Sequence, residues 1–155
     1  MTKTNAMRLL DQKKIEYEIK EIEDADGLSG TEMALKASEN PDEVYKTLVT
    51  VGAKGGHYVF VVPVEKELDL KKAAKCVGEK NISMIHQKEL LPLTGYIHGG
   101  CSPIGMKKFF RTVFDKSALD HERIYFSGGR VGVQVRIKTS DIPKAIKCEF
   151  EDIAS

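Results

Sequence analysis

The chain has 155 residues, of which 41% are hydrophobic, and a formal net charge of +1. This length and apolar content suffice for one core, so we expect a single domain over residues 1–155. No apolar run reaches the roughly 18 residues of a membrane span, and the first residues lack the apolar block of a signal peptide. We therefore expect a cytoplasmic protein with no membrane partner. The near-neutral charge argues against a general nucleic-acid coat but permits a local basic groove.

The first elements are predicted by capping residues and by alternation. Thr4 can cap a helix over about residues 5–14. The next residues, 16–22, alternate with charge as in a half-exposed strand. Thr31 then opens an Ala-rich run that predicts a second helix, ending near Ala37.

The middle of the chain contains the clearest hairpin. Residues 46–53 and 57–64 are dense in β-branched and aromatic side chains and are separated by a Lys-Gly-Gly segment. Asp69 then caps a predicted helix over residues 70–77, and Gly78 follows where a left-handed C-terminal residue belongs.

The last third of the chain is rich in short strands. We expect strands at 81–86, 112–114, 123–127 and 131–137, a turn at Ser127–Arg130, and a last helix capped by Thr139 or Ser140. The mixed order of helices and hairpins predicts an α/β domain. Its mixed, mostly antiparallel sheet is expected to curl towards a barrel with flanking helices.

Cysteine and histidine usage gives no sign of a metal site. The cysteines are Cys76, Cys101 and Cys148, and the histidines outside the Gly-rich stretch are His57, His86 and His121. The cysteines form no CxxC pair and leave one over, which disfavours a disulfide framework and a zinc knuckle. The histidines have no metal-ligand spacing. We therefore expect no metal and no cofactor.

Residues 94–105, TGYIHGGCSPIG, carry four glycines, and Ser102 is followed by a proline. Glycine adopts backbone angles barred to other residues and lets the main chain approach a ligand closely. The stretch predicts a rigid loop whose N–H groups could bind a carboxylate, an ester oxygen or a phosphate. A sharp strand-to-loop reversal explains the same composition equally well.

Three further features suggest chemistry, each beside a simpler explanation. Lys46 opens the first hairpin strand and could direct its charge at a phosphate, although lysines there are more often solvated. The Ser127–Arg130 segment is a second Gly-rich turn with a basic neighbour, where an ordinary hairpin would suffice. Cys101 lies three residues after His98, but a cysteine nucleophile also needs an orienting third group, which the sequence does not supply.

Taken together, five segments resemble the YbaK/EbsC family of freestanding Cys-tRNA(Pro) deacylases, which are related to the editing domain of bacterial prolyl-tRNA synthetases. The segments are VYKTLV at 44–49, LDLKKAAK at 68–75, TGYIHGGCSPIGMKK at 94–108, IYFSGGRVGVQV at 124–135 and FEDIA at 150–154. The resemblance covers almost the whole chain, in order, so it is far more specific than any one segment. It favours a functional interpretation of the Gly-rich loop.

The resemblance implies a role for particular residues. Lys46 matches the family's essential lysine, and Gly99 and Gly100 match glycines of the loop that lines the aminoacyl pocket; these three are the implied catalytic residues. The resemblance also implies that substrate is bound by Thr47, Ser102, Ser127, Gly128 and Gly129. Three further residues implied to bind substrate are those at which this chain departs from the family pattern, and they are described next. No protein nucleophile is assigned in the family, and the mechanism proposed for its cysteine-specific members uses the substrate's own thiol.

The chain departs from the family pattern at the pocket walls. Ile22 and Ser29 stand where cysteine-specific members have aromatic residues, and Gln134 replaces an Asp. The resemblance implies removal of a mischarged amino acid, cysteine foremost, from the 3′ end of tRNA(Pro), with Cys-tRNA(Cys) as a further substrate to test. Three alternatives stay open, namely a deacylase for another small amino acid such as alanine, a non-catalytic aminoacyl-tRNA-binding module, and a cysteine-dependent hydrolase that uses Cys101. A partnership with prolyl- or cysteinyl-tRNA synthetase is also implied.

Overall fold

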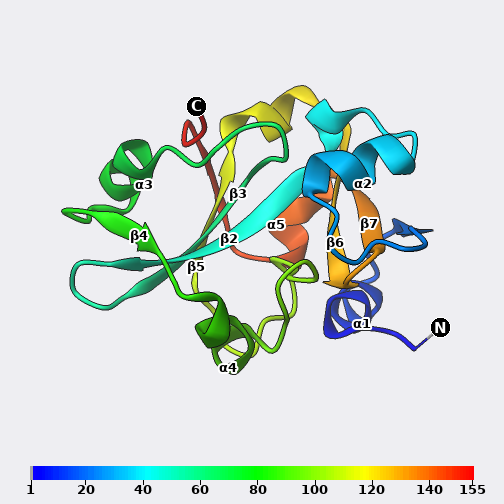
Figure 1. The fold of residues 1–155 in the computed structure, drawn as a ribbon, viewed down its shortest axis with the longest axis horizontal. Coiled ribbons are helices and arrows are strands. Elements are labelled where there is room, and N and C mark those ends of the chain that lie inside the picture. The colour runs from blue at the N-terminus through cyan, green and yellow to red at the C-terminus, as the bar shows by residue number, and fades with distance from the viewer. Residues whose placement is uncertain (1) are drawn as a thin grey trace.

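The computed structural model describes residues 2–155, and its strands form two sheets (Figure 1). The smaller sheet is antiparallel, with the order β1 (Tyr17–Glu21), β7 (Val133–Lys138), β6 (Arg123–Arg130). The larger sheet has the order β4 (Ile82–Met84), β2 (Tyr45–Gly52), β3 (His57–Pro63), β5 (Arg111–Asp115), β8 (Glu149–Glu151). In it β2 pairs antiparallel with both neighbours, whereas β5 is parallel to β3 and to β8.

A parallel bridge between Val44 and Tyr125 joins the two sheets at the start of β2. The sheets do not close into a barrel, so the predicted curl stops short of closure. The α/β class and the largely antiparallel pairing are as predicted from the sequence.

The helices are short and lie around the sheets (Figure 1). They are α1 (Asn5–Gln12), α2 (Gly30–Lys36), α3 (Leu70–Val77), α4 (Leu90–Thr94) and α5 (Ile142–Ala145), with single 3₁₀ segments at η1 (Pro41–Glu43), η2 (Gln87–Glu89), η3 (Lys116–Asp120) and η4 (Thr139–Asp141). The predicted caps of two helices are confirmed. The Thr4 hydroxyl accepts from the Met7 N–H, and Asp69 accepts from Lys71 and Lys72. No helix within residues 2–155 is long and apolar enough to cross a membrane.

The main core lies between the two sheets and α1. Phe114 of β5 meets Phe126 of β6 edge-on, with ring centroids 6.3 Å apart, and Met7 and Leu10 of α1 are fully buried in the same cluster. A second core forms where α3 covers the opposite face of the larger sheet, around Phe60. Strand β2 contributes to both cores, because its alternate side chains point to opposite faces.

Two local predictions were wrong. Ser127–Arg130 is not a turn but the end of β6, where the pairing with β7 shifts register between Ser127 and Arg130. The glycines permit this bulge, since Gly129 has φ +104°, and the chain reverses only afterwards. The last helix does not begin at Thr139 or Ser140. These residues lie in η4, and α5 begins at Ile142 with Pro143 in its first turn.

Candidate active site

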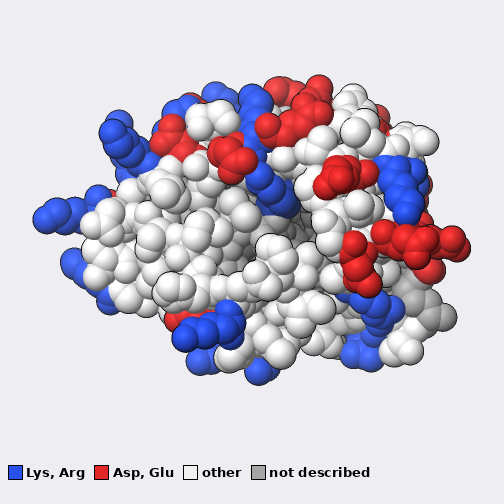
Figure 2. Space-filling model, viewed as in Figure 1, with Lys and Arg blue, Asp and Glu red and all other residues white. Residues whose placement is uncertain are grey.

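A cavity of about 480 Å³ lies where the edge of β2, the start of α2, the β6–β7 pair and the Gly-rich loop converge. Figure 2 shows this face of the molecule hollowed near its centre, with a basic side chain beside the hollow. The apolar lining residues are Leu28, Met33, Val44, Tyr45, Leu48, Val49, Val64, Met84, Ile85, Leu90 and Val133. The polar ones are Ser29, Lys46, Thr47, Gln87, His98, Cys101, Ser127 and Gln134. A mostly apolar wall with a few polar groups is typical of a small-molecule site.

The edge of β2 that faces the cavity has a gap in its pairing around Thr47, between the Val44–Tyr125 bridge and the Val49 carbonyl, which accepts from the Ile85 N–H. Among the described residues, β4 pairs only with Thr50–Gly52 on that side. On the β3 side, the Val44 carbonyl accepts from Val64 and the Gly52 N–H donates to Gly56. Every second residue of an antiparallel strand bonds to the same neighbour, so the residues an even number of positions from Val44 bond to β3. Thr47 lies an odd number of positions away, so its N–H and C=O point to the opposite, unpaired edge.

The side chain of Thr47 adds to this polar site. Its hydroxyl oxygen is buried and has no hydrogen-bond partner among the described residues, although the residue lines the cavity. An unsatisfied buried hydroxyl is unfavourable and is uncommon in folded proteins. Thr47 therefore offers three unused hydrogen-bonding groups to a ligand.

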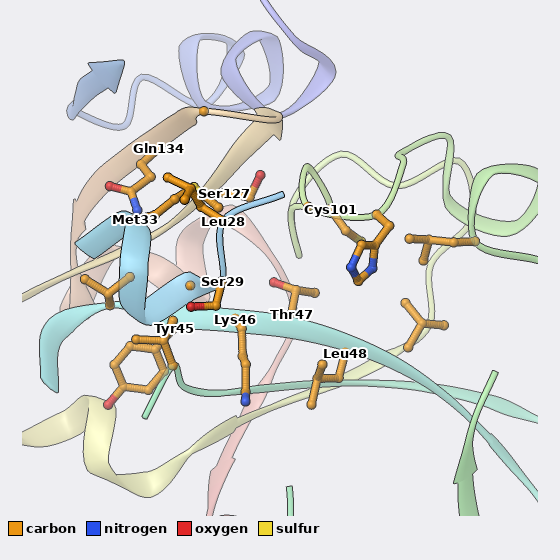
Figure 3. A pocket seen from close by; sticks show the side chains of 18 of the residues that line it. Leu28, Ser29, Met33, Tyr45, Lys46, Thr47, Leu48, Cys101, Ser127 and Gln134 are labelled. Atoms are coloured by element: carbon orange, nitrogen blue, oxygen red, sulfur yellow. The ribbon is translucent and has the colours of Figure 1, made fainter. Parts of the chain in front are cut away.

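Lys46 and Thr47 leave β2 on opposite faces, as strand geometry requires (Figure 3). The Lys46 side chain is 27% exposed, and its Nζ lies 3.6 Å from Oε1 of the largely exposed Glu67. A solvated ion pair of this kind contributes little to stability. The ammonium group is therefore available to a phosphate or another anion that enters the cavity mouth.

The Gly-rich loop reaches the cavity through His98, Gly99 and Cys101. Gly99 has φ +84°, which favours glycine. Gly100 does not line the cavity; a Cβ there would lie 2.9 Å from the backbone N of Val131, so glycine lets the loop approach the β6–β7 connection closely. Ser102 is fully buried and accepts from the Ile104 N–H at 3.2 Å, so it shapes the loop from behind.

The β6 bulge forms the opposite wall. Ser127 lines the cavity, and its hydroxyl accepts from the Gly129 N–H at 3.1 Å. Gly128 and Gly129 lie behind it: the Thr4 hydroxyl donates to the Gly128 carbonyl at 2.5 Å, and a Cβ on Gly129 would lie 3.0 Å from Thr4 and Tyr96 atoms. These two glycines dock α1 onto the sheet.

The three departures from the family pattern lie on one side of the site. Ser29 and Gln134 line the cavity, and Figure 3 shows both beside Leu28 and Met33. Ser29 also caps α2, since its hydroxyl accepts from the Glu32 N–H while the Glu32 carboxylate accepts from the Ser29 N–H. Ile22 is buried outside the lining and bonds through its N–H to the carbonyl of Gly132, which does line it.

The cysteine hypothesis gains no support from the structure. Cys101 lines the cavity but is only 8% exposed, and burial raises the pKa of its thiol to about 12. The nucleophilic form of cysteine is the thiolate, which such a thiol does not form near neutral pH. Within residues 2–155, moreover, no group of three or more His, Cys, Asp or Glu side chains is placed to hold a metal ion.

Several lining residues were missed by sequence reasoning. Met33, Ile85 and Leu90 are apolar residues of short helices and loops, and nothing in their pattern separates a cavity wall from an ordinary core face. His98 was considered only as a partner for Cys101. Only their convergence in three dimensions shows that they share a site.

Comparison with known proteins places the chain in a family. The model of the aminoacyl-tRNA editing domain matches residues 25–145. A protein of Enterococcus faecalis with the name "Putative Cys-tRNA(Pro)/Cys-tRNA(Cys) deacylase EbsC" is 44% identical over 99% of this chain and 94% of its own length.

Two solved structures share the fold. The hypothetical protein APE2540 has a TM-score of 0.88 at 20% identity, and the match covers 98% of this chain and 100% of that one. The structure titled "a putative trans-editing enzyme for prolyl tRNA synthetase" has a TM-score of 0.84 at 23% identity, and the match covers 100% of this chain and 99% of that one. Since the family model spans most of the sequence and the relative aligns almost end to end, this chain belongs to the aminoacyl-tRNA editing domain family.

Proposed function

We propose that this protein is a freestanding deacylase that cleaves the ester between a small amino acid, cysteine foremost, and the 3′ end of tRNA(Pro). The observation that carries the proposal is the convergence of Lys46, Thr47, Gly99 and Ser127 on one cavity. These residues come from three segments that lie far apart in the sequence, and each segment resembles a deacylase motif. The name of the Enterococcus faecalis relative supports the same activity, and extends the substrates to test to Cys-tRNA(Cys).

The polar groups of the cavity suggest how an aminoacyl-tRNA end is held. The ammonium of Lys46 is placed to bind a terminal phosphate or the ester oxygen by charge. The free N–H, C=O and hydroxyl of Thr47 can bind the aminoacyl ester, and the thin wall at Gly99 leaves room for it. The surrounding apolar residues exclude water, which strengthens each of these interactions.

The cavity supplies no activated nucleophile of its own. The thiol of Cys101 has a raised pKa, the Ser29 hydroxyl caps α2, and no base is hydrogen-bonded to either the Ser127 or the Thr47 hydroxyl within residues 2–155. We therefore propose that the substrate's own thiol attacks the ester carbonyl carbon. The 3′ oxygen of the tRNA leaves with the proton that the thiol gives up, and the amino acid leaves as a cyclic thioester.

This route would separate cysteine from serine, which binding alone could hardly do. The two side chains are nearly the same shape, and a small pocket separates such close analogues by only about 1–3 kcal/mol. A thiol with a pKa of about 8.5 is partly ionised near neutral pH and strongly nucleophilic, whereas a hydroxyl is neither. Chemistry would then discriminate where shape does not.

The test is a deacylation panel of Cys-, Ser-, Ala- and Pro-charged tRNA(Pro), with Cys-tRNA(Cys) added, at equal concentrations. We expect Cys-tRNA(Pro) to react fastest and Ser-tRNA(Pro) much more slowly. Equal rates for cysteine, serine and alanine would contradict the thiol route and indicate attack by water. Binding without cleavage of any substrate would contradict the deacylase proposal and favour a non-catalytic binding module.

A synthetase partner belongs to the same proposal. The few cations at the cavity mouth would neutralise few phosphates, so the affinity for tRNA alone should be weak. Association with prolyl- or cysteinyl-tRNA synthetase would deliver the mischarged tRNA. Co-purification of the protein with each synthetase, in the presence and absence of tRNA, tests this.

A further inference from the structure

A buried acidic residue lies directly behind the cavity wall. Glu39 follows α2, and its side chain is fully shielded from solvent. It contacts the face of the smaller sheet that α2 covers (Figure 1), where β-sheet register aligns Lys20, Gln134 and Ser127 in one row across β1, β7 and β6. Gln134 is the middle member of that row and lines the cavity.

The hydrogen bonds of Glu39 fix the orientation of the Gln134 side chain. Both carboxylate oxygens face the same terminal atom of the amide, at 2.9 and 2.5 Å. An ionised carboxylate only accepts hydrogen bonds, so we assign this atom as the NH₂ group. The carbonyl oxygen Oε1 then occupies the other terminal position, away from Glu39, in a side chain that lines the cavity.

Opposing effects act on the pKa of Glu39. Burial raises the pKa of Glu39, while the charges of Lys20 and Arg136 act against that rise. Lys20 Nζ lies 3.9 Å from Glu39 Oε2, and the Arg136 guanidinium lies over the Tyr125 ring. Arg136 also lies 3.9 Å from the Glu18 carboxylate, so Lys20 is the cation closest to Glu39 among the printed pairs of the described residues, and Gln134 connects Glu39 to the cavity.

We propose that Glu39 is a positioning residue, which holds Gln134 Oε1 towards the cavity as the acceptor for the α-ammonium group of the bound aminoacyl ester. This inference rests on the proposed function. The α-amino group of an amino acid is largely protonated near neutral pH and requires acceptors. An amide free to rotate would present its NH₂ group to this cation as readily as its carbonyl. The hydrogen bonds from the amide NH₂ group to Glu39 remove that alternative and polarise the amide, so that Oε1 becomes a stronger acceptor.

Two non-hydrolysable analogues test the proposal. One is cysteine joined by an amide bond to 3′-aminoadenosine, and the other is the same compound without the α-amino group, made from 3-mercaptopropionic acid. We expect the wild-type protein to bind the first about 10- to 150-fold more tightly, the range of one charge-assisted hydrogen bond. In Glu39→Gln this preference should fall close to one. Glu21→Gln, which removes an exposed charge from β1, is the matched control and should keep the preference.

A measurement without ligand tests the contact between Glu39 and Gln134 separately from the proposed function. In the wild-type protein, the Gln134 side-chain NH₂ resonances should exchange slowly with solvent, and their loss in Gln134→Met assigns them. In Glu39→Gln they should exchange faster. Rapid exchange in the wild-type protein, or an unchanged analogue preference in Glu39→Gln, would overturn the role of Glu39. Wild-type protein that binds neither analogue but protects the amide would instead contradict the proposed function.

Discussion

The contact between Gly100 and the β6–β7 connection gives the sharpest test of how the loop shapes the site. A Cβ at this position would lie 2.9 Å from Val131 N, 3.0 Å from Arg130 C and 3.1 Å from Arg130 Cα. All three are backbone atoms, so no side chain can rotate away. Ordinary contacts between carbon atoms begin at about 3.5 Å, so Gly100→Ala must displace the loop by roughly half an ångström.

The expected cost follows from that displacement. Overpacking of this kind costs about 1–3 kcal/mol. For a chain of this size each kcal/mol lowers the melting temperature by about 2–4 °C, so Gly100→Ala should melt about 2–12 °C below the wild-type protein. Because Gly99 and Cys101 flank the displaced residue and line the cavity, we also expect kcat/KM for Cys-tRNA(Pro) to fall by at least about tenfold.

The assay pairs thermal unfolding with deacylation and uses Gly56→Ala as the matched control. A Cβ on Gly56 would meet Tyr58 Oη at 3.6 Å, an ordinary contact, and Gly56 lies in the β2–β3 turn outside the cavity lining. This variant should keep the melting temperature within about 2 °C of the wild-type value. Unchanged melting and rate in Gly100→Ala would refute the packing argument. Lower melting with a full rate would refute the link between the loop and the cavity.

Three other predictions follow from the site. Lys46→Ala should lose most deacylation activity without a change in the free energy of unfolding, because the ammonium group acts by charge, and the control Glu67→Ala should stay active. Activity of Lys46→Ala within about twofold of the wild-type value would contradict this role. Cys101→Ser should keep substantial activity, and iodoacetamide should not inhibit the wild-type enzyme near neutral pH, because the Cys101 thiol, with a pKa of about 12, forms the thiolate only in strong base. Complete loss of activity in a folded Cys101→Ser variant would instead identify Cys101 as a nucleophile. Binding of uncharged tRNA should show a log–log salt slope of about −1.5 to −3, from two to four single-strand phosphate contacts, and a slope steeper than about −6 would reveal an extended basic footprint.

Much of the secondary structure could be predicted because its signals are local. The Thr4 cap, the Asp69 cap and the left-handed Gly78 each depend on neighbours within one helical turn. The β2–β3 hairpin follows from two β-rich runs and a short Gly-rich connection. Such features do not depend on the rest of the fold.

The local predictions failed where tertiary contacts decide the backbone. The glycines after Ser127 are typical of a turn, but here they form a bulge, since Gly128 and Gly129 must accommodate α1 through Thr4. The candidate site shows the same division. The resemblance to the family pointed to Lys46, Gly99 and Ser127, and all three line the cavity. Glu39 was not predicted, because its contact with Gln134 depends on how the segment after α2 lies across the smaller sheet.

The unpaired part of the β2 edge at Thr47 also bears on how copies of this chain behave towards one another. A strand with free N–H and C=O groups is a template for pairing with another chain, and such edges often begin aggregation. Here the edge at Thr47 lies in the cavity, whose lining also includes residues of α2 and the Gly-rich loop. The segments that shape the cavity therefore also cover this part of the β2 edge, and we expect a variant that loosens either segment to aggregate more readily as well as to lose activity.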